Sequence, residues 1–143
     1  MTELFVRYIH FISIFILCSM LVLEYLLLKP EMTLNEIRQF LRVDGLYGLS
    51  AMTTLAAGLT LWFIVGKPAV FYSSNWVFHL KVGIFIIIAL LSIYPTFFFT
   101  RARRKTAASI VIPDRIKNII RTALFAIVIM PLLAVFMARG FGL

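Results

Sequence analysis

Four apolar runs, each long enough to cross a lipid bilayer, constrain this chain more than any other feature. They cover residues 4–28, 45–65, 75–100 and 118–138, with Pro, Gly or charged residues at their ends. About 20 apolar residues in a helix span the hydrocarbon core. The sequence therefore predicts an all-α integral membrane protein, a four-helix bundle with up-down topology in a single domain of residues 1–143. A hydrophobic content of 62% agrees with this prediction, since soluble domains are closer to half apolar.

The basic residues predict which way the bundle faces. The chain has 14 Lys and Arg residues. Those in or beside the first and third connections are Lys29, Arg38, Arg42, Arg101, Arg103, Arg104, Lys105, Arg115, Lys117 and Arg121. The opposite side holds Arg7, Lys67, Lys81 and Arg139. Because Lys and Arg are enriched in cytoplasmic loops, we expect both termini outside. We assign the net charge of +8 to anionic lipid headgroups and predict no nucleic-acid partner.

A short amphipathic segment, "TLNEIRQFLRVD" (33–44), precedes the second span. Thr33 and Glu36 have the spacing of a helix capping box. Four apolar residues share one helical face: Leu34, Ile37, Phe40 and Leu41. This pattern predicts a short amphipathic cytoplasmic helix on the membrane surface; the alternative is a partner-binding helix.

The only two histidines, His10 and His79, lie near the outer ends of the first and third spans. At a rise of about 1.5 Å per residue, their depths are about 9 Å and about 6 Å. These two spans run parallel, so the imidazoles can face each other across the bundle. Haem iron takes protein ligands from opposite faces of its ring. We therefore predict that His10 and His79 ligate one haem b per protomer. The alternatives are interhelical hydrogen bonds, another metal or a proton path.

Four basic residues lie on the same outer side as the histidines: Arg7, Lys67, Lys81 and Arg139. Haem propionates are anionic, and charge-assisted hydrogen bonds favour basic partners. Lys81 is two residues from His79, so the two side chains diverge around the helix. We therefore expect Lys81 at the ring edge rather than at the iron, with Arg7 and Arg139 as further haem-binding residues.

Small residues recur through the second span, with Ser50, Thr54 and Gly58 at four-residue spacing. Such a surface permits close helix packing or a homodimer. It could also leave room for a flat porphyrin, and the two interpretations can hold on different faces.

Glu24 lies near the inner end of the first span. A carboxylate within a membrane usually has a partner. We therefore expect an ion pair with Lys29 or Arg121, and a proton path is the alternative.

Three segments of the chain are distinctive: "VDGLYGLSAMTTLAAGL" (43–59), "FHLKVGIF" (78–85), which holds a His-x-Lys motif, and "LLSIYPT" (90–96). They resemble a family of small four-span bacterial inner-membrane proteins of unknown function. The resemblance implies a multi-pass protein of the bacterial inner (plasma) membrane and no particular activity.

A looser similarity is to the four-helix membrane protoporphyrinogen oxidase and to the copper-resistance membrane family. By the oxidase pattern, His10 and Lys81 are the matching pair. The stretch after His10, "FISIFILCSMLVLEYLLL", lacks the oxidase's glycine-containing Tyr-Leu-Pro-Arg stretch, and His79 adds a second axial ligand. Both departures favour an electron carrier.

The function predicted from the sequence is therefore that of a membrane-bound b-type cytochrome. It would transfer electrons with quinone, superoxide or another small redox partner, and an oxidoreductase activity is left open. The alternatives are a protoporphyrinogen oxidase-like enzyme of haem synthesis and a non-haem scaffold or permease. No phosphate-binding glycine loop or nucleophile–base constellation supports hydrolase or kinase chemistry.

Overall fold

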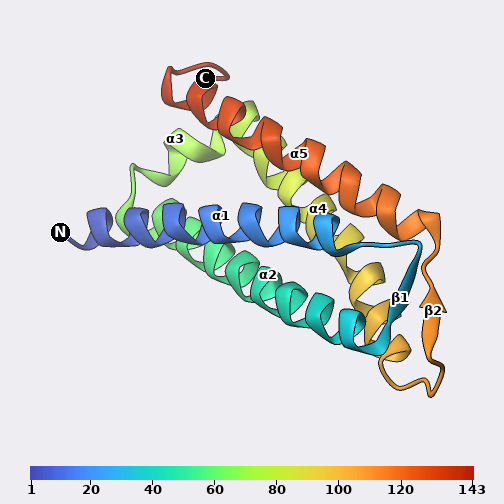
Figure 1. Cartoon of the computed structure of the whole chain (residues 1–143). Coiled ribbons are helices and arrows are strands. Elements are labelled where there is room, and N and C mark those ends of the chain that lie inside the picture. The colour runs from blue at the N-terminus through green and yellow to red at the C-terminus, as the bar shows by residue number, and fades with distance from the viewer.

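The computed structural model describes residues 1–143 as a bundle of long helices (Figure 1). The elements are α1 (Thr2–Leu27), β1 (Glu31–Thr33), α2 (Leu34–Thr60), the π-helical turn η1 (Leu61–Val65), α3 (Ala69–Ser73), α4 (Trp76–Ala102), β2 (Ser109–Val111) and α5 (Asp114–Ala138). Four helices are long and apolar enough to cross a membrane: α1, α2 with η1, α4 and α5. The predicted four-span bundle is therefore confirmed.

The helices alternate in direction, as predicted, so both termini lie at one end of the molecule (Figure 1). We call this the terminal end, and the opposite end, with β1 and β2, the ribbon end. α1 packs mainly along α2, and α4 mainly along α5. α1 and α5 meet toward the ribbon end and separate toward the terminal end (Figure 1). The bundle is thus two helical hairpins joined most closely at the ribbon end.

A two-stranded antiparallel ribbon connects the two hairpins. It was not predicted from the sequence. β1 pairs with β2 in the register Glu31↔Val111, Met32↔Ile110 and Thr33↔Ser109. The Ile112 amide also donates to the Pro30 carbonyl (2.8 Å). The ribbon thus links the first and third connections of the bundle.

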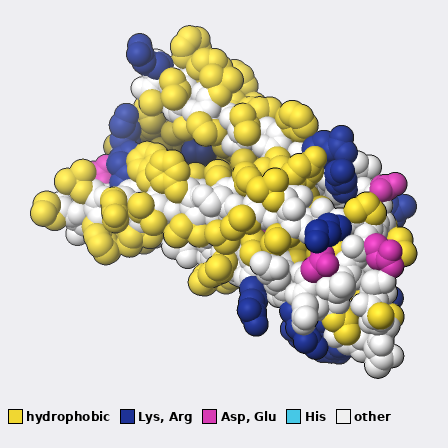
Figure 2. Space-filling view, viewed as in Figure 1, with side chains coloured by type: hydrophobic (Ala, Val, Ile, Leu, Met, Phe, Trp, Pro, Cys, Tyr) yellow, Lys and Arg dark blue, Asp and Glu magenta, His cyan; other side chains and the backbone are white.

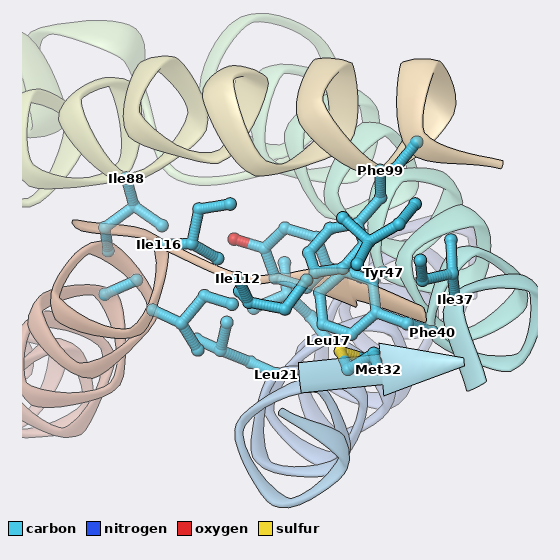
Figure 3. Packing of buried hydrophobic residues seen from close by; sticks show 14 residues of the cluster. Leu17, Leu21, Met32, Ile37, Phe40, Tyr47, Ile88, Phe99, Ile112 and Ile116 are labelled. Carbon is cyan, nitrogen blue, oxygen red and sulfur yellow. The ribbon is translucent and has the colours of Figure 1, made fainter. Parts of the chain in front are cut away.

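The buried core lies beneath this ribbon. Figure 3 shows side chains of the long helices and of β1 converging there. The rings of Phe40 and Phe99 stack with centroids 4.1 Å apart, and Met32 fills the space beside them from β1. Leu17, Leu21, Ile88 and Ile116 continue the same cluster. The core therefore fixes the ribbon end more firmly than the terminal end.

The amphipathic segment before the second span is the first part of α2 and not a separate surface helix. Thr33 caps it as predicted, because its hydroxyl accepts from the Glu36 amide (3.3 Å). The expected position on the membrane surface is wrong, however. Ile37 and Phe40 are fully buried against the protein's own core. The apolar pattern alone could not distinguish burial in lipid from burial beneath the β1–β2 ribbon, because the ribbon was not predicted.

Large apolar side chains cover the outside of the bundle (Figure 2). They include Phe15, Leu49, Leu90 and Val128, all exposed. Lys and Arg side chains gather at the ribbon end (Figure 2). An apolar girdle with charged ends is the surface of a protein that sits in a bilayer. The side that the ribbon end faces stays a prediction from the positive-inside pattern.

Asn75 organises the terminal end. It is fully buried, and its Oδ1 caps α4 by accepting from the Val77 and Phe78 amides (2.9 and 3.3 Å). Its Nδ2 donates to the Phe141 carbonyl (3.1 Å). A side chain at Gly142 would place its Cβ 2.4 Å from Asn75 Oδ1, and Gly142 has a φ of +93°. Glycine therefore lets the C-terminal residues close over the start of α4.

Candidate functional site

His10 lies on the face of α1 that packs against α2. Its Nδ1 is 3.0 Å from the Thr54 carbonyl. A carbonyl oxygen only accepts hydrogen bonds, so Nδ1 must carry the proton. In the neutral ring the lone pair is then on Nε2. That atom makes no hydrogen bond within the protein, and it is not among the fully buried polar atoms without a partner. His10 therefore offers an accessible Nε2 lone pair.

Small residues on α2 make room for the His10 ring. A Cβ at Gly58 would stand 3.2 Å from His10 Cε1. One turn earlier, the Thr54 hydroxyl donates to Ser13 Oγ (3.0 Å), and the Ser13 hydroxyl donates to the His10 carbonyl (2.9 Å). The four-residue repeat of Ser50, Thr54 and Gly58 thus packs α2 against α1, as the close-packing interpretation proposed.

His79 is held differently. It lies in the first turn of α4, it is exposed, and its Nε2 is 2.8 Å from the Ser73 carbonyl. By the same reasoning this Nε2 carries the proton in the neutral ring. The long-helix neighbours of α1 are α2 and α5, and the structure shows no ring contact between His10 and His79. Their pairing at one iron stays a prediction.

The four outer basic residues do not gather at one point. Lys81 is half-buried and lies within electrostatic range of the His10 ring, as does Arg7. Arg7 is paired with Glu3 on its own helix. Lys67 lies 4.2 Å from the centroid of the Phe71 ring. Arg139 ends α5 and is exposed. The structure therefore brings Lys81 and Arg7 near His10, and leaves Lys67 and Arg139 at the surface.

A pocket between α2 and α4 was missed from the sequence. Its volume is about 460 Å³, and ten of its 15 lining residues are hydrophobic. Gly45, Gly48 and Ala51 line it from α2. On this face of α2 the small residues leave open space, whereas on the face toward α1 they permit close packing. We call it the α2–α4 pocket. Small residues along one face of α2 were the sign of this pocket in the sequence. The arrangement of the helices was needed to show that this face lines a cavity.

One end of the α2–α4 pocket is polar. The Thr96 hydroxyl donates to Asp44 Oδ2 (2.7 Å), and the hydroxyls of Tyr47 and Ser92 are 3.0 Å apart. All four residues line the pocket. These two pairs are the polar links between α2 and α4, and they place acceptors and hydroxyl groups within an apolar cavity.

Glu24 lies behind this polar end. Its carboxyl group is within hydrogen-bonding reach of Asp44, only 3% of its surface is exposed, and its Oε1 has no hydrogen-bond partner. The expected ion pair is wrong: Lys29 pairs with Glu36 (3.0 Å), and Arg121 contacts Asn118. Lys29 follows α1 in the connection, where the amphipathic start of α2 lies within its reach. We call Glu24 and Asp44 the carboxyl pair.

Comparison with known proteins gives one match. Residues 2–142 match a family described as "Predicted membrane protein (DUF2214)". No curated protein and no solved structure matches the chain.

Proposed function

Since the chain belongs to this family of predicted membrane proteins of unknown function, DUF2214, we propose that it is a membrane-bound b-type cytochrome with His10 as an iron ligand. The family match confirms the expected membrane family and leaves the activity open. The proposal is carried by one observation, the orientation of the His10 ring, with Nδ1 on a backbone carbonyl and Nε2 accessible.

This orientation is the one that metal-binding histidines adopt. They usually donate the proton of the second ring nitrogen to a carbonyl or a carboxylate, which fixes the tautomer and the ring plane. The Thr54 carbonyl does this for His10. The neighbouring Gly58 leaves space for the ring. Neutral imidazole is a strong ligand of haem iron, so the donor at this position fits the cofactor.

His79 is the second ligand in this proposal. Its Nε2 now bonds to the Ser73 carbonyl (2.8 Å), and ligation would replace that bond. Ser73 ends the short α3 next to the exposed start of α4, so the exchange leaves the core intact. Lys81, which pairs with no carboxylate, would bind a propionate, and Arg7 would do so on exchanging its partner Glu3. Haem, when bound, supplies one-electron chemistry, and the chain sets its position and potential.

The test is a reduced-minus-oxidised visible spectrum of the protein purified in mild detergent and given added haem. We expect a low-spin b-type spectrum that His10→Ala abolishes. His79→Ala should leave a five-coordinate, high-spin haem. Lys67→Ala is the matched control for loss of an outer positive charge, because Lys67 lies on Phe71 at the surface.

A colourless protein that does not bind added haem would overturn the proposal. The non-haem scaffold or permease would then be the favoured function. An unchanged low-spin spectrum in His79→Ala would show that His79 is not an iron ligand and would leave the assignment of His10 in place.

A protoporphyrinogen oxidase-like enzyme is the second candidate, because His10 and Lys81 are the pair that matches the oxidase pattern in the sequence. It predicts that the chain complements a bacterial strain lacking that oxidase, and that Lys81→Ala abolishes complementation while His79→Ala does not. Failure to complement at normal membrane levels would exclude this candidate.

A further inference from the structure

We infer that the α2–α4 pocket binds a neutral, lipid-soluble molecule of the hydroquinone class. The inference names the substrate class of the proposed electron carrier, but it rests on other residues than those proposed for haem. It is carried by the size of the pocket and by its polar end.

The pocket has the size and walls of a small-molecule site. Its volume of about 460 Å³ is within the range of about 300–1,000 Å³ that is usual for ligand pockets. Met52, Phe85 and Phe97 provide apolar walls, and Gly45 and Gly48 leave the α2 side open. Since α2 and α4 are both membrane-spanning helices, a ligand would enter from the lipid rather than from water.

The polar end selects a head group that donates hydrogen bonds. Asp44 uses Oδ2 to accept from Thr96, and a carboxylate has further acceptor sites. The paired hydroxyls of Tyr47 and Ser92 can each donate or accept. Hydroxyl groups on a compact ring would satisfy these acceptors, and the apolar walls would hold the ring and its tail.

The carboxyl pair strengthens this selection. Glu24 and Asp44 are both buried, at 3% and 7% exposure, and neither takes part in an ion pair. Two adjacent carboxyl groups shielded from water retain a proton, so the pair carries one negative charge rather than two. A neutral hydroxyl donor is compatible with that charge, whereas an anionic lipid headgroup would be repelled by it. No Lys or Arg lines the pocket, so a phosphate group has no partner there.

The polar end of the pocket is separate from the histidine region, although Phe85 lines the pocket one turn from Lys81. Ser92 and Lys81 lie on the same helix, and a separation of eleven positions corresponds to about 16 Å along the axis. Ligand binding at the polar end and the haem proposal can therefore fail independently.

The experiment is photolabelling of the full-length protein in phospholipid nanodiscs with an azido-ubiquinone probe, with decylubiquinol as competitor. We expect saturable labelling of α2 or α4. Decylubiquinol should compete more strongly than decylubiquinone, because only the reduced ring donates hydrogen bonds. Asp44→Asn keeps an acceptor for Thr96 and should weaken competition by decylubiquinol about tenfold, as loss of a hydrogen bond to a charged group does.

Gly48→Leu should abolish labelling by filling the pocket, since a Cβ at Gly48 meets no atom within 4 Å. Gly83→Leu is the matched control: a Cβ at Gly83 also meets no atom within 4 Å, and Gly83 does not line the pocket. Thermal melts monitored by circular dichroism establish that both variants are folded.

Three results would overturn the inference. One is labelling that does not saturate or that persists in Gly48→Leu. The second is competition by cholesterol hemisuccinate equal to that by decylubiquinol, which would show that the pocket does not select a hydroquinone head group. The third is loss of a haem spectrum in Gly48→Leu with His10 intact, which would assign the pocket to the porphyrin. If the wild-type protein binds no haem but is still labelled saturably, only the cytochrome proposal is overturned.

Discussion

The stacked pair Phe40–Phe99 tests whether the ribbon end carries the stability of the bundle. Both side chains are fully buried, and their ring centroids are 4.1 Å apart. Phe97 lies two residues before Phe99 on α4, and it is 60% exposed on the lipid-facing surface. Phe99→Ala and Phe97→Ala therefore make the same chemical change on one helix, inside and outside the core.

The expected free-energy changes follow from this contrast. A residual cavity of about 100 Å³ at position 99 costs about 2.4 kcal/mol at roughly 24 cal/mol per Å³. Loss of the aromatic pair adds about 0.5–1.5 kcal/mol. Phe99→Ala should thus lower the free energy of unfolding by about 3–4 kcal/mol. Phe97→Ala should change it by less than about 1 kcal/mol, because this ring lines the open α2–α4 pocket and is mostly exposed to lipid in both the folded and the unfolded state.

The assay is SDS-induced unfolding in mixed micelles, followed by far-ultraviolet circular dichroism. A double-mutant cycle with Phe40→Ala isolates the pair, since residues in contact give non-additive losses. Equal losses for Phe97→Ala and Phe99→Ala would refute the assignment of the core. Strict additivity of the Phe40 and Phe99 substitutions would refute the stacking.

Two further substitutions test buried polar groups. Asn75→Ala should cost about 1–2 kcal/mol through loss of the α4 cap and should speed amide hydrogen exchange in residues 139–143. Asn75→Asp keeps the capping oxygen and loses only the donor to Phe141, so a melting temperature as low as that of the alanine variant would contradict the capping role. Glu24→Gln should change the free energy of unfolding by less than about 1 kcal/mol, because a protonated carboxyl and an amide can both donate to Asp44. A gain of several kcal/mol in SDS titration would show that both carboxyls are ionised in the folded protein.

Hydropathy was sufficient to predict the four spans and their alternation, because membrane thickness fixes helix length. Thr33 was correctly predicted to cap α2, since capping depends on residues three apart. The β1–β2 ribbon was missed, because three-residue strands leave little local pattern and their pairing joins distant connections. That omission also misplaced Ile37 and Phe40, whose partners come from those connections.

For the candidate site, the sequence predicted His10, His79 and Lys81 as site residues and left their geometry open. Equal depth along two helices says nothing about which helices are neighbours. The structure packs α1 on α2 and α5, and His79 bonds to Ser73. The α2–α4 pocket depends on Asp44 and Thr96 meeting across 52 positions, which no local pattern contains.

The β1–β2 ribbon also has a consequence for biosynthesis. The side chains of Glu31 and Ser109, which hydrogen-bond across the ribbon, are 78 residues apart, and the two strands belong to different hairpins. While the chain is being made, β1 waits without a partner until the third connection has left the ribosome. Met32 and Phe40 stay uncovered during that interval, since their neighbours Ile110 and Phe99 are made later. Closure of the ribbon end is therefore a late event in synthesis, and a chain truncated before residue 109 would leave this apolar surface open to chaperones and proteases.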